Sequence, residues 1–185
     1  MVRRIGMLVN PDAGLGGKLG FKGSDGRAQE ARDAGAEDRS GPRMRQTLQR
    51  CIGRLDDVEM VTCSGRMGSD WCPLEHTIVF ETPDHTSAET TQSAVKALCE
   101  SGIELLLYAG GDGTTRDIVE ALDNPDLPVI GAPGGVKMHS GCFAASPNAA
   151  AEVLRSWLDG DLLLARTEVM DLDEEVYREG RWSVR

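Results

Sequence analysis

Short apolar runs alternate with amphipathic segments along the chain. Five of these runs have the length of a buried strand and are flanked by turn-forming residues. An alternation of strands and helices is typical of βαβ units, in which helices join parallel strands. The expected strands cover residues 3–9, 57–62, 76–81, 104–109 and 127–131.

Helical spacing of apolar residues and capping signals predict the helices between these strands. Thr86 to Glu89 has the pattern of a capping box, which opens a helix to about residue 101. Ser146-Pro147 is an N-cap and first-turn pair for a helix that ends at Gly160. That helix is expected to bury Ala150, Val153, Leu154, Trp157 and Leu158. Further helices are expected near 27–35 and 42–54, and another follows the Gly-Gly-Asp-Gly-Thr stretch and ends at about residue 123.

The pattern predicts a doubly wound α/β fold over residues 1–162, with a mostly parallel sheet and helices on both faces. The tail changes character. Runs at 162–164 and 167–170 have strand character, and residues 177–182 have the pattern of a hairpin. We therefore expect residues 163–185 to begin a β-rich second domain.

The stretch from Gly110 to Thr114, with the sequence Gly-Gly-Asp-Gly-Thr, directly follows a predicted buried strand and precedes a predicted helix. Such a loop presents bare backbone N–H groups at a helix N-terminus, which suits a phosphate. Asp112 adds a carboxylate to that loop, which can give the loop a chemical role beyond binding.

Two further glycine-rich stretches, at 10–26 and 131–141, also follow predicted strands. The first of them matches neither the P-loop nor the dinucleotide-binding pattern. Loops after parallel strands gather at the carboxyl edge of a sheet, so the three stretches are expected to converge there. The candidate phosphate-binding residues are Asn10, Gly14, Gly16, Gly17, Gly110, Gly111, Gly113, Thr114, Gly134, Gly135 and Lys137.

Composition narrows the class of protein. A net charge of −10 argues against general binding to nucleic acid or to a membrane surface. An apolar run of membrane-spanning length is absent from the sequence. The five cysteines form no CxxC pair, which argues against zinc and disulfides and agrees with a cytoplasmic protein. For Cys142 we favour a small buried thiol over a reactive one.

Several stretches together carry a resemblance to a known family. They are Val9-Asn10-Pro11, Ala13-Gly14, Gly16-Gly17, Lys22-Gly23, Asp25-Gly26, Gly110 to Thr114, Gly134 to Ser140 and Glu168 to Glu175. With these stretches the chain resembles the NAD kinase and diacylglycerol kinase superfamily, whose hallmark is GGDGT. The VKMHS stretch resembles the branch of ATP- or polyphosphate-dependent NAD kinase-like proteins.

The resemblance implies an N-terminal α/β domain followed by a β-rich domain that completes the substrate site. A chain of 185 residues is short for both domains, so we expect a fragment or a truncated member. It also implies NAD and ATP or polyphosphate as substrates, Mg²⁺ as cofactor and a homo-oligomer. An Asn-Glu or Asn-Asp pair after GGDGT, expected from the family, has no match here.

The resemblance makes Asp112 the catalytic candidate. It would accept a proton from the ribose 2′-hydroxyl of NAD or organise Mg²⁺, and the sequence does not choose between these roles. We assign no metal-ligating residue. His139 and Ser140 are expected to be structural. Two other functions stay open, a kinase for a lipid or small-metabolite hydroxyl, and a nucleotide-binding module without turnover.

Overall fold

Five parallel strands form one sheet in the order β3-β2-β1-β4-β5. The computed structural model describes residues 2–15, 28–135 and 138–170. The strands are β1 (Arg3–Val9), β2 (Val58–Cys63), β3 (His76–Phe80), β4 (Leu105–Gly110) and β5 (Val129–Pro133). Each lies within two residues of its predicted range, so the predicted parallel sheet is confirmed.

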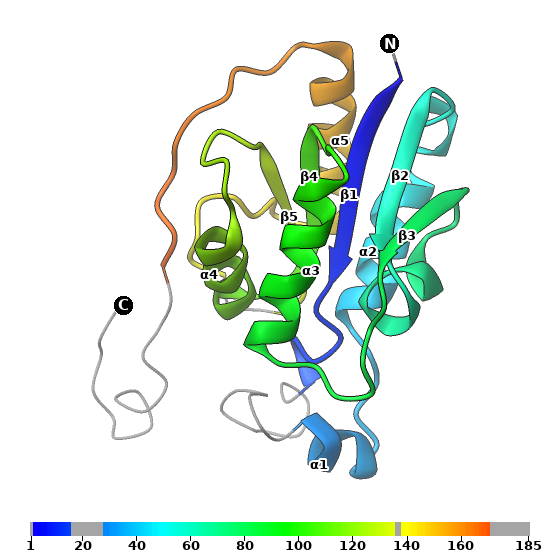
Figure 1. The fold of residues 1–185 in the computed structure, drawn as a ribbon, viewed down its shortest axis with the longest axis vertical. Coiled ribbons are helices and arrows are strands. Elements are labelled where there is room, and N and C mark those ends of the chain that lie inside the picture. The colour runs from blue at the N-terminus through cyan, green and yellow to red at the C-terminus, as the bar shows by residue number, and fades with distance from the viewer. Residues whose placement is uncertain (1, 16–27, 136–137, 171–185) are drawn as a thin grey trace.

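β1 lies in the middle of the sheet and pairs with β2 on one side and β4 on the other (Figure 1). The chain leaves β1 toward β2 and returns to its other side through β4. The strand order therefore reverses between β1 and β4. In open α/β sheets this switch point is the place where the loops at the carboxyl edge part and leave a crevice for a ligand.

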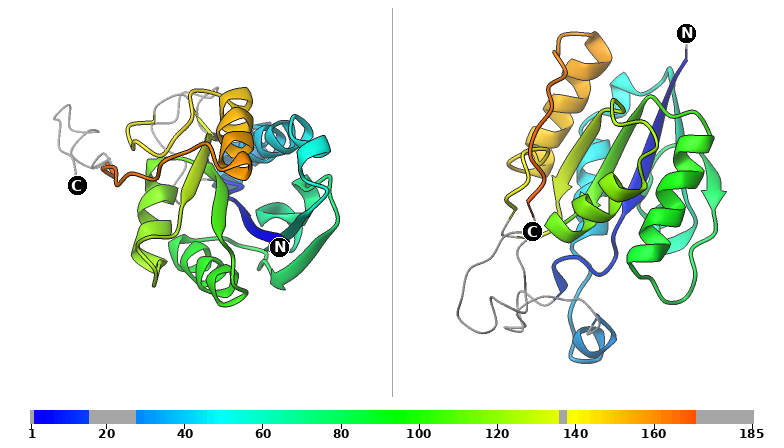
Figure 2. Two further views of the ribbon diagram at one scale, coloured as in Figure 1. Left: turned by 90° about the horizontal axis from the view of Figure 1, so that it is seen from above. Right: turned by 60° about the vertical axis from the view of Figure 1, so that its left-hand side comes forward.

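Helices cover both faces of the sheet (Figure 2). On one face lie α2 (Ser40–Gln49) and α5 (Pro147–Asp159), which pack on alternate side chains of the strands, such as Met7 and Leu107. On the other face lie α3 (Ala88–Glu100) and α4 (Asp112–Ala121), against Leu8 and Leu106. These strand leucines are fully buried, and each contributes roughly 1.5–3 kcal/mol. The doubly wound architecture is confirmed.

Shorter elements complete the described fold. They are α1 (Ala28–Asp33), η2 (Ile52–Arg54), η3 (Gly65–Met67) and η4 (Ser69–Trp71). α2 begins two residues before its predicted start, because Pro42 sits in the first turn, where a helix tolerates proline. A Cβ on Gly41 would lie 2.0 Å from the Trp71 ring, so this turn packs directly on η4.

Two helix predictions need correction. The N-cap of α3 is Ser87, not Thr86, and its hydroxyl accepts from the backbone N–H of Thr90. Thr86 instead donates its hydroxyl to Asp12 at 3.0 Å. In α5, Val153 is 37 % exposed rather than buried, while Ala151 takes a core position.

The strands predicted at 162–164 and 167–170 are absent, since residues 161–170 have no regular structure. Leu163 is 99 % exposed, which shows that no neighbour covers it among the described residues. Figure 1 shows this segment extended from the end of α5 toward the loop that follows β5. The predicted hairpin at 177–182 lies outside the described residues.

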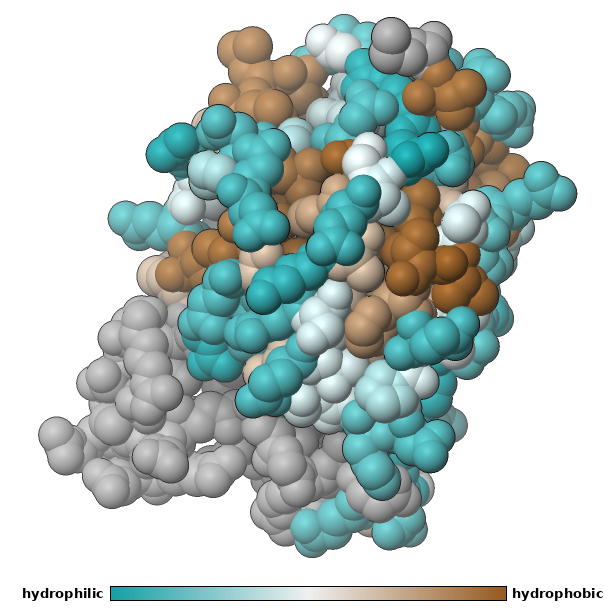
Figure 3. Space-filling model, in the orientation of Figure 1, coloured by the Kyte–Doolittle hydropathy of each residue, from teal (hydrophilic) through white to brown (hydrophobic). Residues whose placement is uncertain are grey.

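No helix within the described ranges is both long and apolar enough to cross a membrane. Figure 3 shows the face of the molecule that carries α3 and α4. Hydrophilic residues dominate this face, and apolar residues are scattered between them.

Candidate functional site

Loops from three strands meet at the carboxyl edge of the sheet. The side-chain amide of Asn10, after β1, donates to the hydroxyl of Thr114, after β4, at 2.8 Å. The backbone N–H of Gly134, after β5, donates to the carbonyl of Gly110 at 2.7 Å. The predicted convergence of the three glycine stretches is therefore confirmed for their described parts.

The first and third loops also contact each other directly. Gly14 has φ +82°, a conformation that favours glycine, and a Cβ there would lie 2.3 Å from the carbonyl oxygen of Gly134. The hydroxyl of Ser40, at the start of α2, donates to the carbonyl of Ala13 at 3.1 Å. These contacts close the loops into one surface at the switch point between β1 and β4.

Arg43 of α2 holds the third loop from the opposite side. Its guanidinium donates to the carbonyl of Pro133 at 2.6 Å and to that of Gly135 at 2.9 Å. A planar guanidinium with several donors suits two neighbouring carbonyls. Sequence reasoning missed both Arg43 and Ser40, because no local pattern marks a helix residue that reaches a distant loop, 90 positions away for Arg43 and 27 for Ser40.

The glycines of the site fall into two groups. A Cβ on Gly110 would lie 2.6 Å from the Thr114 side chain, and one on Gly134 would lie 2.7 Å from the Gly110 carbonyl oxygen. A Cβ on Gly111 or Gly113, in contrast, would meet nothing within 4 Å. The first group is required by packing within the protein, whereas the second lies against open space.

The N-terminus of α4 faces that open space. The first intrahelical bond runs from the Thr115 N–H to the Gly111 carbonyl at 3.0 Å. The N–H groups of Asp112, Gly113 and Thr114 have no acceptor among the described residues. Gly111, as the N-cap, has no side chain to supply one. Free N–H groups and the positive end of the helix dipole favour an anion at this position.

Asp112 lies at the first position of α4 and is 9 % exposed. Its Oδ1 atom accepts from the backbone N–H of Ser140 at 2.8 Å, from the Ser140 hydroxyl at 2.7 Å and from the His139 N–H at 3.1 Å. Among the described residues, its Oδ2 atom accepts from the His139 N–H alone, at 2.9 Å. The carboxylate thus ties the third loop to the helix and keeps one oxygen largely free. Sequence reasoning did not find this link.

The buried hydroxyl of Tyr108 supports the GGDGT turn through a hydrogen bond to Thr115. The Tyr108 hydroxyl lies 2.5 Å from the Thr115 hydroxyl and 3.1 Å from the Cys142 sulfur. Burial raises the pKa of Tyr108 and the pKa of Cys142 above their ordinary values. Both groups therefore keep their protons at neutral pH, which agrees with a structural Cys142 and not with a reactive thiolate.

Not all predicted site residues are described. Gly16, Gly17 and Lys137 lie outside the described residues. Asn10, Gly14, Gly110, Gly111, Asp112, Gly113, Thr114, Gly134 and Gly135 are described, and the structure brings them to one edge of the sheet.

A sequence model of the ATP-NAD kinase N-terminal domain matches residues 5–162. The chain belongs to the ATP-NAD kinase family. The match spans all three converging loops, and it makes this a NAD kinase-like phosphotransferase domain. No curated protein matches the chain.

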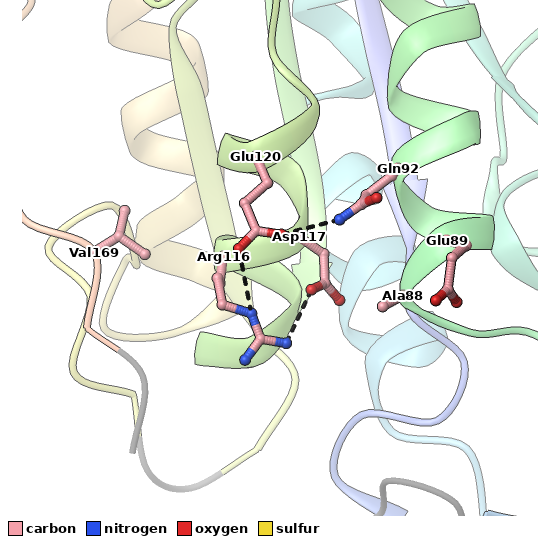
Figure 4. A pocket seen from close by; sticks show the side chains of 7 residues that line it. All are labelled: Ala88, Glu89, Gln92, Arg116, Asp117, Glu120 and Val169. Carbon is pink, nitrogen blue, oxygen red and sulfur yellow. Dashed lines mark hydrogen bonds and ion pairs between the residues drawn. The ribbon is translucent and has the colours of Figure 1, made fainter. Parts of the chain in front are cut away.

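The ATP-NAD kinase domain also has a cleft of about 600 Å³ beside this site, between α3 and α4 (Figure 4). Arg116 pairs there with Asp117 at 3.0 Å, and Gln92 donates to Glu120 at 3.0 Å. None of the predicted site residues lines this cleft. Within the described part of the domain, no group of three or more His, Cys, Asp or Glu residues could hold a metal ion.

Proposed function

We propose that this domain transfers a phosphoryl group from ATP or polyphosphate to the 2′-hydroxyl of NAD, which makes NADP. One observation carries the proposal. Asp112, in the family's GGDGT stretch, keeps Oδ2 largely free at a helix N-terminus where loops from three strands meet. Family membership supports a kinase, and this geometry supports Asp112 as the group that acts on the acceptor.

The first step is binding of the donor's phosphates. The free N–H groups at the start of α4 can donate hydrogen bonds to these phosphates. The open space at Gly111 and Gly113 lets phosphate oxygens approach the backbone closely. A chain with a net charge of −10 has to bind a polyanion through such local groups rather than through its overall field.

The second step is the transfer itself. The oxygen of the acceptor hydroxyl forms a bond to the terminal phosphorus, and its proton passes to Oδ2 of Asp112. The bond from that phosphorus to the bridging oxygen breaks, and ADP or a shortened polyphosphate leaves. Because the transition state is loose, positioning and neutralisation of charge matter more than the strength of the base.

Mg²⁺ fits this site in one particular way. Oδ1 of Asp112 already accepts three hydrogen bonds, so Oδ2 is the atom that would contact Mg²⁺ if Asp112 organised the metal instead of accepting the proton. Mg²⁺ is usually held by one or two carboxylates together with substrate phosphates, which matches a single available carboxylate oxygen. Bound there, Mg²⁺ would neutralise charge on the phosphate chain.

The test is an assay for NADP with NAD, Mg²⁺ and either ATP or polyphosphate in separate reactions. Asp112→Asn should lower kcat by about 10²- to 10⁴-fold, the usual contribution of a positioned proton acceptor. Asp117→Asn is the matched control, because Asp117 is a similarly buried carboxylate of α4 at 7 % exposure. It should change kcat by less than about threefold, since it pairs with Arg116 outside the site.

A wild-type protein that binds ATP but forms no NADP with either donor would overturn this proposal. The same reactions, followed by ATP consumption with other hydroxyl acceptors, would then separate a kinase with another substrate from a nucleotide-binding module.

A further inference from the structure

Ser140 lies between Asp112 and the segment that follows α5. It is 4 % exposed, and its hydroxyl oxygen is 2.7 Å from Oδ1 of Asp112. The same oxygen is 3.1 Å from the carbonyl oxygen of Met170 and 3.1 Å from the Met170 backbone nitrogen. One hydroxyl thus contacts the catalytic candidate on one side and the backbone of residues 161–170 on the other.

A serine hydroxyl has one proton to donate and two lone pairs with which to accept. The Met170 N–H donates to this oxygen, and that bond is compatible with either position of the proton. The proton itself goes either to Oδ1 of Asp112 or to the Met170 carbonyl, but not to both at full strength. A charged acceptor makes the stronger hydrogen bond, so the proton favours Asp112.

Residues 167–170 are fixed to the third loop by more than this bond. The Gly141 N–H donates to the carbonyl of Glu168 at 3.1 Å. A Cβ on Gly141 would lie 2.0 Å from the Thr167 hydroxyl oxygen, so the Gly141 backbone is in close contact with the Thr167 side chain. Residues 139–141 therefore touch Asp112 on one side and residues 167–170 on the other.

The bonds to Asp112 are uneven between its two oxygens. Oδ1 accepts three hydrogen bonds, which exceeds its two lone-pair directions, whereas Oδ2 accepts one. We propose that Ser140 is a positioning residue that holds Oδ1, so that Oδ2 faces the acceptor hydroxyl, and that residues 167–170 support this orientation through Ser140. The inference rests on the proposed function of Asp112.

Kinetics test the positioning role. Ser140→Ala should lower kcat about 10- to 100-fold, the range for a hydrogen bond to a charged group, and leave KM for NAD and ATP within about twofold. Ser140→Thr, which keeps the hydroxyl, should recover most of kcat. In the Asp112→Asn background, Ser140→Ala should have almost no further effect, because Ser140 acts through that carboxylate.

Ser146→Ala is the matched control, since the Ser146 hydroxyl caps α5 by accepting from the Ala149 N–H and has no bond to Asp112 among the described residues. It should lower the melting temperature but leave kcat within about twofold. If Ser140→Ala multiplies the loss caused by Asp112→Asn, or if it raises KM instead of lowering kcat, the positioning role is wrong.

Hydrogen exchange tests the link to residues 167–170 without any need for activity. Because the Met170 N–H donates to Ser140, Ser140→Ala should speed exchange of the Met170 amide about tenfold or more, while Ser146→Ala should not. Faster exchange in a protein that makes no NADP would sustain the link and reject only the proposed reaction. Unchanged exchange would reject the link even if NADP forms.

Discussion

The carboxyl edge of the sheet has an open half and a closed half. β1, β4 and β5 end in glycine loops, and the first three N–H groups of α4 find no acceptor in them among the described residues. β2 ends at Cys63, and the chain then closes over itself. The Ser64 N–H donates to the carbonyl of Phe80 at 2.8 Å, and a Cβ on Gly68 would lie 2.1 Å from the Thr62 hydroxyl oxygen.

Both halves have the same strand direction, so the edge alone does not make a site. The difference lies in the strand order, which reverses between β1 and β4, and in glycines that no packing contact requires. A glycine buried between backbones, such as Gly68 or Gly134, is a structural requirement. A glycine facing open space, such as Gly113, is not required by packing, and under the proposed function it leaves room for a phosphate.

The largest expected effect is on a packed glycine of the open half. In Gly134→Ala the added methyl would meet the Gly110 carbonyl oxygen and the Ser40 hydroxyl, at 2.7 Å and 2.4 Å from the Cβ. We expect a loss of about 3 kcal/mol, or roughly 10 °C in melting temperature, from this overpacking. The control is Gly53→Ala, where a Cβ meets nothing within 4 Å. Equal melting temperatures for the two variants would remove the distinction between packed and open glycines.

Gly113→Ala should move stability and binding in opposite directions. Alanine favours a helix over glycine by about 0.5–1 kcal/mol, and the Cβ meets nothing in the protein, so thermal unfolding should shift slightly upward. A methyl group beside the free N–H groups hinders a phosphate, so calorimetric titration with ATP should show about tenfold weaker binding, or 1.4 kcal/mol. Unchanged affinity would mean that the open glycines do not serve the nucleotide.

The smallest effect concerns the closed half and alkaline pH. Burial raises the pKa of the Cys63 thiol to about 12. Above pH 9 the unfolded chain releases this proton while the folded chain keeps it, so stability is full below pH 9 and falls as pH rises. At pH 9.5 the loss is about 0.8 kcal/mol. Urea unfolding of the wild type and Cys63→Ala between pH 8 and 9.5 checks this. The prediction is contradicted if the unfolding free energy of the wild type falls with pH no more steeply than that of Cys63→Ala.

The sheet and the meeting of its loops could be predicted from the sequence because both follow from short-range patterns. Apolar runs mark the strands, and glycines after them mark the loops. The parallel arrangement then sends every such loop to one edge. The link between Asp112 and Ser140 could not be predicted in this way. It joins residues 28 positions apart through a turn whose geometry no periodicity encodes.

The wrong predictions also have physical reasons. Thr86, with Glu89 three residues on, matches the capping pattern better than Ser87 does, but its hydroxyl bonds to Asp12, a partner 74 positions away. Residues 162–164 have strand propensity, but no neighbouring strand is present to pair with them in the described part of the chain. Propensity of this kind depends on a partner surface, which a single segment does not reveal.

The central place of β1 has a consequence for folding order. Ile5 pairs with Leu105, and Arg3 pairs with Val58, so the strand translated first acquires its second neighbour about 100 residues later. Pairings of such sequence separation close slowly, because the intervening chain loses its freedom before the contact forms. During translation, one backbone edge of β1 therefore stays unpaired until β4 has been synthesised. The proposed phosphate site, which needs the loops after β1, β4 and β5, can form only after β5 has also paired with β4.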